Sequence, residues 1–193
     1  MSPKVAVVTG SNKGIGLAIV RALCKEYQGD VYLTSRDASR GEDAVKTLAA
    51  DGLKAAFHQL DIDDVNSIAA AAAYFKDKYG GVDVLVNNAG IAFKGADPAP
   101  FAVQAEVTLK TNFFATRDML THFLPLIKAG GFPVTMTSLG ILLNACCPGW
   151  VRTDMAGSKA TKSPEEGAVT PVYLALLPPG ATDPHGKFVS EKE

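Results

Sequence analysis

The sequence Val5-Ala6-Val7-Val8-Thr9-Gly10-Ser11-Asn12-Lys13-Gly14-Ile15-Gly16 carries the strongest structural signal in the chain, because an apolar run typical of a buried strand leads into three glycines. A helix-like sequence, residues 17–27, follows directly. Gly10 allows a tight turn, Gly14 lets the backbone approach a ligand closely, and Gly16 lets the helix pack on the strand. Free N–H groups at the start of the helix favour an anion. The spacing therefore predicts a site for the pyrophosphate of a dinucleotide, with a plain glycine-rich loop as the alternative.

Strand-like and helix-like patterns alternate along the rest of the chain, which is typical of crossover units around a parallel sheet. Strands are expected at residues 4–9, 31–34, 55–59, 82–87, 133–138, 142–146 and 187–190. Helices are expected at residues 15–27, 39–50, 65–79, 104–128 and 164–177, the last beginning with a capping box from Ser163 to Glu166. With 193 residues, 47% of them apolar, the chain can bury one substantial core. We therefore expect a single α/β domain, residues 1–193, built on a doubly wound, Rossmann-like parallel sheet.

The composition argues against several other classes of protein. The formal net charge is −1, from 19 basic and 20 acidic residues, and gives no reason to expect nucleic acid or an anionic membrane as a partner. No apolar run approaches the ~20 residues that span a bilayer, and the first strand is expected too early for a signal peptide to precede it. Three cysteines, two of them adjacent, indicate a reducing compartment, so we expect a cytoplasmic protein. The three histidines are scattered, and no metal site is predicted.

Polar and small residues follow the expected strands at their carboxyl ends, where open sheets of this kind bind ligands. The sequence Asn87-Asn88-Ala89-Gly90 follows the fourth strand, and its small residues leave space for a ring or a ribose beside the backbone. Asp61 and Ile62 follow the third strand. Asp61 is suited to accept a hydrogen bond from an adenine amino group, although a plain helix-capping acid is the alternative.

The end of the second strand predicts the type of dinucleotide. A sheet that selects NAD usually ends this strand in an acid that binds the ribose 2′-hydroxyl, whereas a 2′-phosphate requires a cation. This chain has Arg36 there, with Arg40 one turn later and Lys13 in the glycine loop. Arginine can bind a phosphate with two parallel hydrogen bonds, so NADP(H) is the expected cofactor. The alternative is that both arginines are solvated residues at a helix start, with Asp37 neutralising Arg36.

These motifs together resemble the short-chain dehydrogenase/reductase family, and closely its cytosolic NADPH-dependent carbonyl reductases. The resemblance rests on residues 9–16, 87–90, 110–114, 138 and 144–155. It implies that the chain reduces small-molecule ketones, aldehydes and quinones with hydride from NADPH, and that intact relatives are monomers. The cofactor contacts that the motifs and the resemblance imply are Gly10, Asn12, Lys13, Gly14, Ile15, Gly16, Arg36, Arg40, Asp61, Ile62, Asn88, Ala89, Gly90, Pro148, Gly149, Val151 and Thr153.

Two of the family's four catalytic side chains have counterparts in this sequence. Ser138 matches the serine that stabilises the substrate carbonyl, and Asn112 matches the asparagine that holds a proton-relay water. The tyrosine general acid and the lysine that lowers its pKa are absent from the expected place. One Tyr-x-x-x-Lys match exists, Tyr74 to Lys78, but it falls on the third helix near the end that returns to the amino-terminal edge of the sheet. We therefore reject it as the catalytic pair.

The missing pair belongs on a crossover helix between the fifth and sixth strands, where only residues 139–141 separate the expected strands. Parallel neighbours need about a dozen residues or more for a crossover, so the domain is predicted to be internally truncated near residues 138–141. A tight hairpin could join the two strands, but it would reverse the second and carry the Pro148-Gly149 loop away from the nicotinamide. Loss of the helix would also expose apolar residues of the 104–128 helix, with Phe113, Phe114 and Phe123 as candidates, and favour association.

Three functions remain open from the sequence. The chain could be part of an active carbonyl reductase whose complete form is longer than 193 residues. It could be a true deletion product that retains part of the cofactor site and transfers no hydride. It could also be a non-enzymatic interaction protein that uses the exposed helix face, for example to pair with an intact relative.

Overall fold

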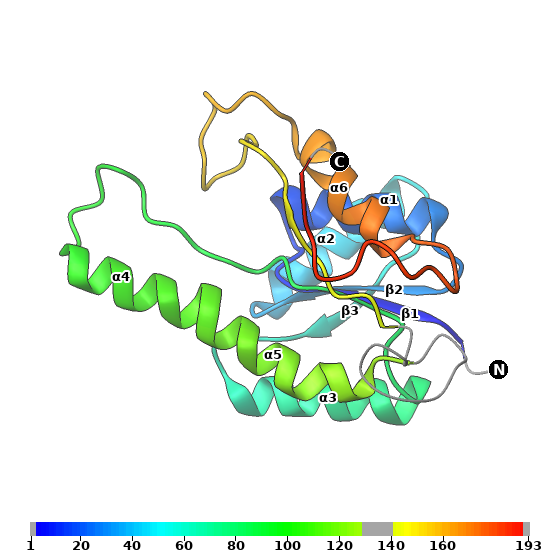
Figure 1. Cartoon of the computed structure of the whole chain (residues 1–193). Helices are drawn as coiled ribbons and strands as arrows, with labels where there is room; N and C mark the ends of the chain where they lie inside the picture. Colours follow the sequence, from blue (N-terminus) through cyan, green and yellow to red (C-terminus); the bar gives the residue numbers. More distant parts are fainter. Residues whose placement is uncertain (1–2, 129–140, 191–193) are drawn as a thin grey trace.

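A computed structural model describes residues 3–128 and 141–190 of the chain (Figure 1). Its main sheet has four parallel strands in the order β3-β2-β1-β4. The strands are β1 (Val5–Val8), β2 (Asp30–Ser35), β3 (Ala56–Gln59) and β4 (Val84–Val86). The four expected strands of this sheet are confirmed, with bounds that differ by at most two residues at either end.

Helices cover both faces of the sheet (Figure 1). On one face lie α1 (Gly14–Glu26), α2 (Ala38–Ala50) and α6 (Pro164–Ala175). On the other lie α3 (Val65–Tyr79) and a long helical segment formed by α4 (Phe101–Leu109), η1 (Lys110–Ala115), α5 (Thr116–Phe123) and η2 (Leu124–Leu126). Strand β1 is buried on both sides, because Val5 and Val7 pack with α3 while Ala6 and Val8 pack with α1. This arrangement is the expected doubly wound α/β fold.

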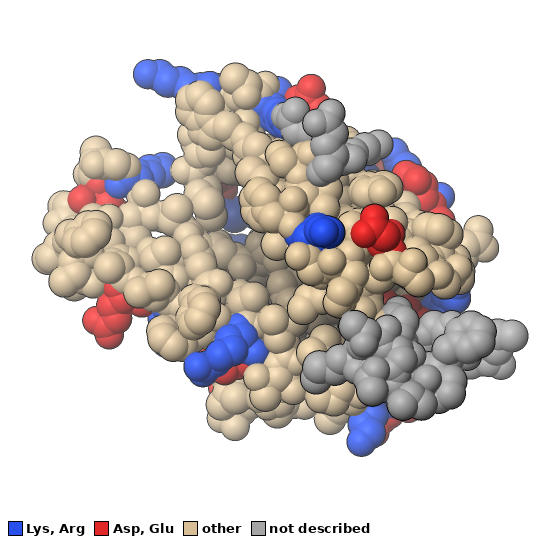
Figure 2. Space-filling model, viewed as in Figure 1, with Lys and Arg blue, Asp and Glu red and all other residues tan. Residues whose placement is uncertain are grey.

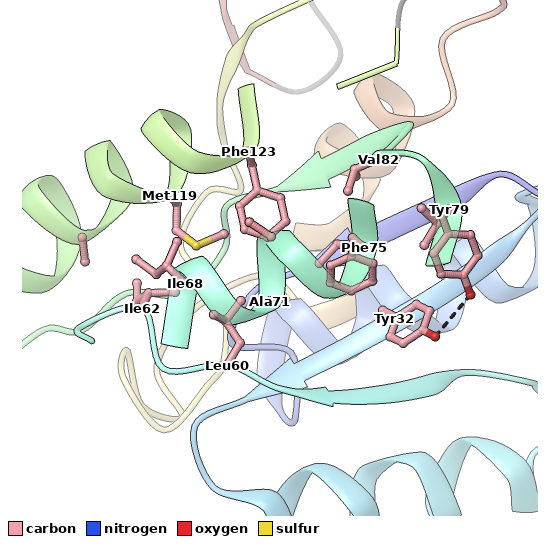
Figure 3. Close-up of a cluster of buried hydrophobic side chains, with 14 residues drawn as sticks. Tyr32, Leu60, Ile62, Ile68, Ala71, Phe75, Tyr79, Val82, Met119 and Phe123 are labelled. Atoms are coloured by element: carbon pink, nitrogen blue, oxygen red, sulfur yellow. Dashed lines mark hydrogen bonds between the residues drawn. The ribbon is translucent and has the colours of Figure 1, made fainter. Parts of the chain in front are cut away.

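Aromatic side chains fill the core between the sheet and α3 (Figure 3). The rings of Tyr32 and Phe75 meet edge to face with their centroids 4.9 Å apart, and Phe123 reaches Phe75 from α5 with a centroid distance of 6.2 Å. Phe123 is fully buried, so the expectation that it would be exposed is wrong. Phe123 belongs to the core because it packs between α5 and α3, and the helices that cover a sheet bury their apolar faces in this way.

The helix expected at residues 104–128 begins earlier and is not uniform. It starts at Phe101, and its middle, η1, is a π-helix rather than an α-helix. After η2 the chain runs beside the residues that precede β4, where Ile127 forms a parallel bridge with Val82. Residues 129–140, which include the expected strand 133–138, Ser138 and most of the predicted junction, lie outside the described residues.

A second, two-stranded parallel sheet follows in the carboxyl-terminal part of the chain. It pairs β5 (Ala145–Cys147) with β6 (Phe188–Ser190). Strand β5 begins three residues later than expected, because residues 142–144 form no strand. Helix α6 lies between the two strands in sequence and packs along α1, which joins this part of the chain to the main sheet.

Helix α4 extends beyond the sheet and has no buried residue (Figure 1). Phe101 is 84% exposed, Leu109 54%, Phe113 58% and Phe114 45%. The predicted exposure of Phe113 and Phe114 is therefore confirmed, and the surface over α4, at the left of Figure 2, is mostly uncharged. Within residues 3–128 and 141–190, no helix has both the length and the apolar character that a bilayer crossing needs.

Candidate functional site

The glycine loop at the end of β1 is packed so tightly that its three glycines are required. Gly10 and Gly14 both have a φ of +58°, a conformation that favours glycine. A Cβ on Gly10 would lie 2.8 Å from the Cα of Ala89. A Cβ on Gly16 would collide with the side-chain amide of Asn88 and lie 2.8 Å from the Cα of Ser11. The loop therefore has the close backbone packing and the free helix N-terminus that a pyrophosphate requires.

The segment after β4 holds this loop in place. Asn88 Nδ2 donates hydrogen bonds to the carbonyl oxygens of Thr9 (2.9 Å) and Gly10 (3.2 Å). Thr9 Oγ1 in turn accepts hydrogen bonds from the backbone N–H groups of Asn88 and Ala89, each at 3.0 Å. The predicted cofactor contacts Asn88 and Ala89 thus lie directly beside Gly10, and the Asn88 side chain is used to position the loop.

Asn112 lies on the π-helix η1 and faces the same segment. Its Oδ1 accepts a hydrogen bond from the N–H of Ile91, and its Nδ2 donates one to the carbonyl of Ile91, both at 2.8 Å. The neighbouring Thr111 is buried and donates a hydrogen bond from Oγ1 to Asp63 Oδ2 at 2.9 Å. These bonds tie the helix to the loops after β3 and β4, and π-helical turns occur frequently at functional sites. A Cβ on Gly90 would lie 3.3 Å from Asn112 Oδ1, which places Gly90 in the same cluster.

The segment after β5 reaches the glycine loop from the other side. Thr153 Cγ2 lies 3.3 Å from the position of a Cβ on Gly14, and Lys13 Nζ lies 2.7 Å from Asp154 Oδ2. Val151 is 3% exposed and packs on α6, where a Cβ on Gly167 would lie 2.6 Å from Val151 Cγ2. The expectation that a hairpin would carry the loop that begins at Pro148-Gly149 away from the site is therefore wrong, whereas the junction itself lies outside the described residues. The packing of α6 on α1 brings the loop back to the glycines.

The loop after β3 presents one polar and one buried residue. Asp61 Oδ1 accepts a hydrogen bond from the N–H of Asp63 at 3.0 Å, which leaves Oδ2 of Asp61 without a hydrogen bond within the described part of the chain. Ile62 is 8% exposed and its side chain belongs to the core under α3. Only the backbone of Ile62 is therefore placed to contact a ligand.

The basic residues near the end of β2 differ in their partners. Asp37 pairs with Arg40, with Oδ2 3.5 Å from Nε, and caps α2 by accepting a hydrogen bond from the Arg40 N–H at 3.0 Å. The suggestion that Asp37 neutralises Arg36 is therefore wrong. The reason is the i,i+3 spacing of Asp37 and Arg40 on the first turn of the helix. Arg36 is exposed and makes no ion pair with any described residue, so it is the cation best placed to meet a phosphate.

The sequence match Tyr74 to Lys78 lies far from these loops. Lys78 Nζ donates hydrogen bonds to Tyr74 Oη at 3.0 Å and to Tyr32 Oη at 2.8 Å. Tyr32 is in the first half of β2 and the pair is at the end of α3, so the cluster lies at the amino-terminal edge of the sheet. The glycine loop lies at the carboxyl-terminal edge. Among the described residues, no group of histidine, cysteine and acidic side chains could hold a metal ion.

Of the remaining predicted contacts, Asn12 and Ile15 are half-buried in the glycine loop, and Pro148 and Gly149 begin the loop that ends at Thr153. Sequence reasoning missed Asp154, Thr111 and Ile91. Asp154 is separated from Lys13 by 141 positions, and no local pattern indicates such a contact. The polar Thr-Asn pair inside an apolar helix was the available signal for Thr111.

Comparison with known proteins agrees with this geometry. Residues 4–140 match the model of the short chain dehydrogenase family. Carbonyl reductase (NADPH) 1 of Homo sapiens is 49% identical over 266 residues, with 97% of this chain and 96% of the relative covered. Carbonyl reductase (NADPH) 3 of Rattus norvegicus is 44% identical over 267 residues, with 98% and 96% covered. Among solved structures, an actinorhodin polyketide ketoreductase variant crystallised with NADPH has a TM-score of 0.80 at 26% identity, with 98% of this chain and 95% of that chain covered.

The comparison with the human relative also shows a difference in length. The match extends over 266 residues, which exceeds the 193 residues of this chain by 73. At least that many residues of the relative therefore have no counterpart here. The fold, the glycine loop and the sequence relationships together show that the chain belongs to the short-chain dehydrogenase family.

Proposed function

We propose that this chain has the cofactor site of an NADPH-dependent carbonyl reductase and, at 193 residues, binds NADP(H) without transferring hydride. One observation carries the proposal. The loops that would hold a dinucleotide meet at the carboxyl-terminal edge of the sheet, whereas the single Tyr-x-x-x-Lys match of the sequence lies at the opposite edge. In a carbonyl reductase that has the complete set of catalytic residues, bound NADPH would supply the hydride for reduction of a small-molecule ketone, aldehyde or quinone.

A different group of residues would contact each part of the dinucleotide. The loop of Gly10, Asn12, Gly14, Ile15 and Gly16 would receive the pyrophosphate on backbone N–H groups. Arg36, Arg40 and Lys13 supply positive charge for the 2′-phosphate. The adenine would lie near Asp61 and the backbone of Ile62. The ribose and nicotinamide would lie along residues 88–90 and the loop that includes Pro148, Gly149, Val151 and Thr153.

The reaction step fails for lack of a proton donor. Reduction places negative charge on the carbonyl oxygen, and a hydrogen-bond donor must stabilise that charge while an acid delivers a proton. Ser138 and Asn112 are the proposed catalytic residues that remain, and Asn112 already uses both ends of its amide on Ile91. Neither can replace a phenol whose pKa is lowered by a neighbouring ammonium. We place the missing tyrosine and lysine among the 73 or more residues of the human relative that have no counterpart in this chain.

The test begins with the intact mass of the purified protein. A mass of 20.2 kDa confirms that the chain is complete as written, and a larger mass shows that the active form is longer. NADPH binding is then measured by calorimetry, and NADPH oxidation is followed with a quinone against a control without protein. We expect binding with no oxidation above the control. Turnover by protein of the verified mass refutes the loss of activity, and absence of binding refutes the cofactor assignment.

A second function, in protein association, is favoured by the exposed face of α4 and η1. Phe101, Leu109 and Phe113 are each more than half exposed, the first two at the ends of α4 and the third on η1. Apolar patches of this kind mark interaction surfaces or sites of aggregation. We propose that this face associates with a second copy or with an intact relative, in place of the monomeric state, in the cytoplasm. The measurement is sedimentation over a range of concentrations, alone and with an intact carbonyl reductase.

A further inference from the structure

The ammonium of Lys13 is bound by a carboxylate within the candidate cofactor site. Lys13 precedes α1 as its N-cap residue, and its Nζ lies 2.7 Å from Asp154 Oδ2. The two side chains are 62% and 80% exposed, so the pair lies at the mouth of the site and not in the core. The contact links the loop after β1 to the loop after β5, which are otherwise joined by the approach of Thr153 to Gly14.

Asp154 is the more firmly held partner of the pair. Arg152, two residues before Asp154, donates a backbone hydrogen bond to the carbonyl of Lys162 at 2.8 Å, and its guanidinium donates to the carbonyl of Thr161 at 2.6 Å. Thr153 accepts a backbone hydrogen bond from Gly157 at 2.8 Å, and Val151 is buried against α6. Lys13, by contrast, carries its charge on a flexible four-carbon stem. Of the two residues, Lys13 is therefore the one that can move to another anion.

The three cations assigned to the 2′-phosphate differ in their acidic partners. The hydrogen bond and charge of Lys13, with a smaller contribution from the charge of Lys94, hold the pKa of Asp154 below its usual range. Arg36 has no acidic partner among the described residues, whereas Arg40 forms an ion pair with Asp37. A phosphate arriving near Arg36 would therefore find one free guanidinium, one paired guanidinium and one ammonium already bound to a carboxylate.

We propose that Asp154 is a specificity-determining residue that competes with the 2′-phosphate of NADP(H) for the ammonium of Lys13. This inference rests on the proposed NADP(H) site. In the structure Lys13 is turned to Asp154. Binding of a 2′-phosphate draws the ammonium away, or obliges it to share its three N–H donors between two anions. Asp154 thereby lowers the affinity of the site for NADP(H) relative to its affinity for NAD(H). It acts through Lys13 and does not itself touch the cofactor.

The size of the effect follows from the exposure of the pair. Exposed ion pairs are weak and are screened by salt, so removal of the carboxylate should tighten binding of a 2′-phosphate roughly two- to fivefold at low ionic strength. At about 1 M salt, where the Debye length falls to about 3 Å, the difference should disappear. A ligand that lacks the 2′-phosphate should be unaffected at either salt concentration.

The experiment compares two probes that lack a nicotinamide, adenosine 2′,5′-bisphosphate and 5′-AMP, by calorimetry with the full chain. These probes leave out contacts of the nicotinamide with residues 148–153, so a loosened loop does not change the readout. The variants are Asp154→Asn, Lys13→Met and the double variant. The matched control is Asp118→Asn, which removes a partly exposed carboxylate 3.1 Å from Arg117 on α5, on the opposite face of the sheet, and changes the net charge equally.

Asp154→Asn should tighten the bisphosphate and leave 5′-AMP unchanged, whereas Asp118→Asn should change neither. Lys13→Met should weaken the bisphosphate, and adding Asp154→Asn to it should have no further effect. The proposal is overturned if Asp154→Asn fails to tighten the bisphosphate, if it tightens both probes equally, or if its effect persists without Lys13. A native chain that binds neither probe refutes the proposed cofactor site itself, whereas normal binding with no effect of Asp154→Asn refutes only the competition.

Discussion

Lys78 Nζ lies 3.0 Å from Tyr74 Oη, one helical turn earlier on α3, and the pair lies at the edge of the sheet that is opposite the glycine loop. Tyr32 joins them from β2, with its Oη 2.8 Å from both Lys78 Nζ and Tyr74 Oη. Burial opposes ionisation of Tyr32, but the hydrogen bonds from Lys78, Tyr74 and Tyr79 outweigh it, so the pKa of Tyr32 is lowered. The chain thus has a phenol of lowered pKa beside an ammonium, but at the opposite edge of the sheet from the loops proposed to hold the nicotinamide.

Replacing Lys78 with methionine should raise the pKa of Tyr32 and leave cofactor binding unchanged. A lowered tyrosine pKa stabilises the fold above the ordinary value of about 10, and this stabilisation is lost as the pH falls through the folded-state value. The raised pKa of Lys78, caused by its bonds to Tyr32 and Tyr74, acts in the other direction and stabilises the fold below its ordinary value. An ultraviolet titration should show one tyrosine that ionises early in the native chain and late in Lys78→Met. Loss of NADPH affinity in this variant would contradict the placement of the cluster.

The imidazole of His58 should make the fold less stable in mild acid. His58 stacks on Tyr74 with ring centroids 4.5 Å apart, and burial lowers its pKa. The folded state favours the neutral form of His58. Its contribution to the free energy of unfolding is therefore fully present above the ordinary histidine pKa of about 6.5 and is lost as the pH falls through the folded-state pKa. His58→Phe keeps a ring in this place and removes the ionisation. Urea unfolding at about pH 7.5 and 5 should show a smaller loss of stability in His58→Phe than in the native chain. Equal losses would show that other groups carry the acid sensitivity.

The first strand, its glycine loop and its helix could be predicted almost to the residue, because all the information is local. An apolar run, glycines at fixed spacing and an amphipathic helix each follow from steric and burial rules within 25 residues or fewer. The capping box of Ser163 and Glu166 is equally local, and both of its hydrogen bonds are present. The pairing of Asp37 with Arg40 could also have been read from their spacing.

The parts that sequence reasoning missed depend on contacts between distant segments. The π-helical turn at Asn112 is stabilised by the backbone of Ile91, and the Lys13 to Asp154 pair depends on how α6 packs on α1. The burial of Phe123 depends on Phe75 in the same way, because a helical pattern shows which residues are apolar and not which are covered. The fold class follows from local rules, whereas the closure of the site follows from packing.

Gly16→Ala should abolish nucleotide binding and cost about 1–3 kcal/mol of stability, as overpacking of a tight site usually does. The new methyl group would collide with the Asn88 amide that positions Thr9 and Gly10, so the whole loop must shift. Gly95→Ala is the matched control, since a Cβ there meets nothing within 4 Å. Calorimetry with NADPH and urea unfolding measure the two effects. Native affinity in Gly16→Ala would show that the tight packing of the loop is not required for binding.

Serine in place of exposed phenylalanines on α4 and η1 should reduce association without loss of stability. Phe101 and Phe113 are 84% and 58% exposed, so Phe101→Ser with Phe113→Ser removes apolar surface from water contact and breaks no core packing. The contrasting variant is Phe123→Ala, which removes a fully buried ring and should cost about 3–5 kcal/mol. Sedimentation at rising concentration should show the native chain associating and the double serine variant remaining monomeric, with equal unfolding midpoints.

If the native chain is monomeric throughout, or if the serines leave association unchanged, this helix face is not the interface. An intact relative added to both proteins then decides between self-association and pairing with that relative, because the serine variant should lose both.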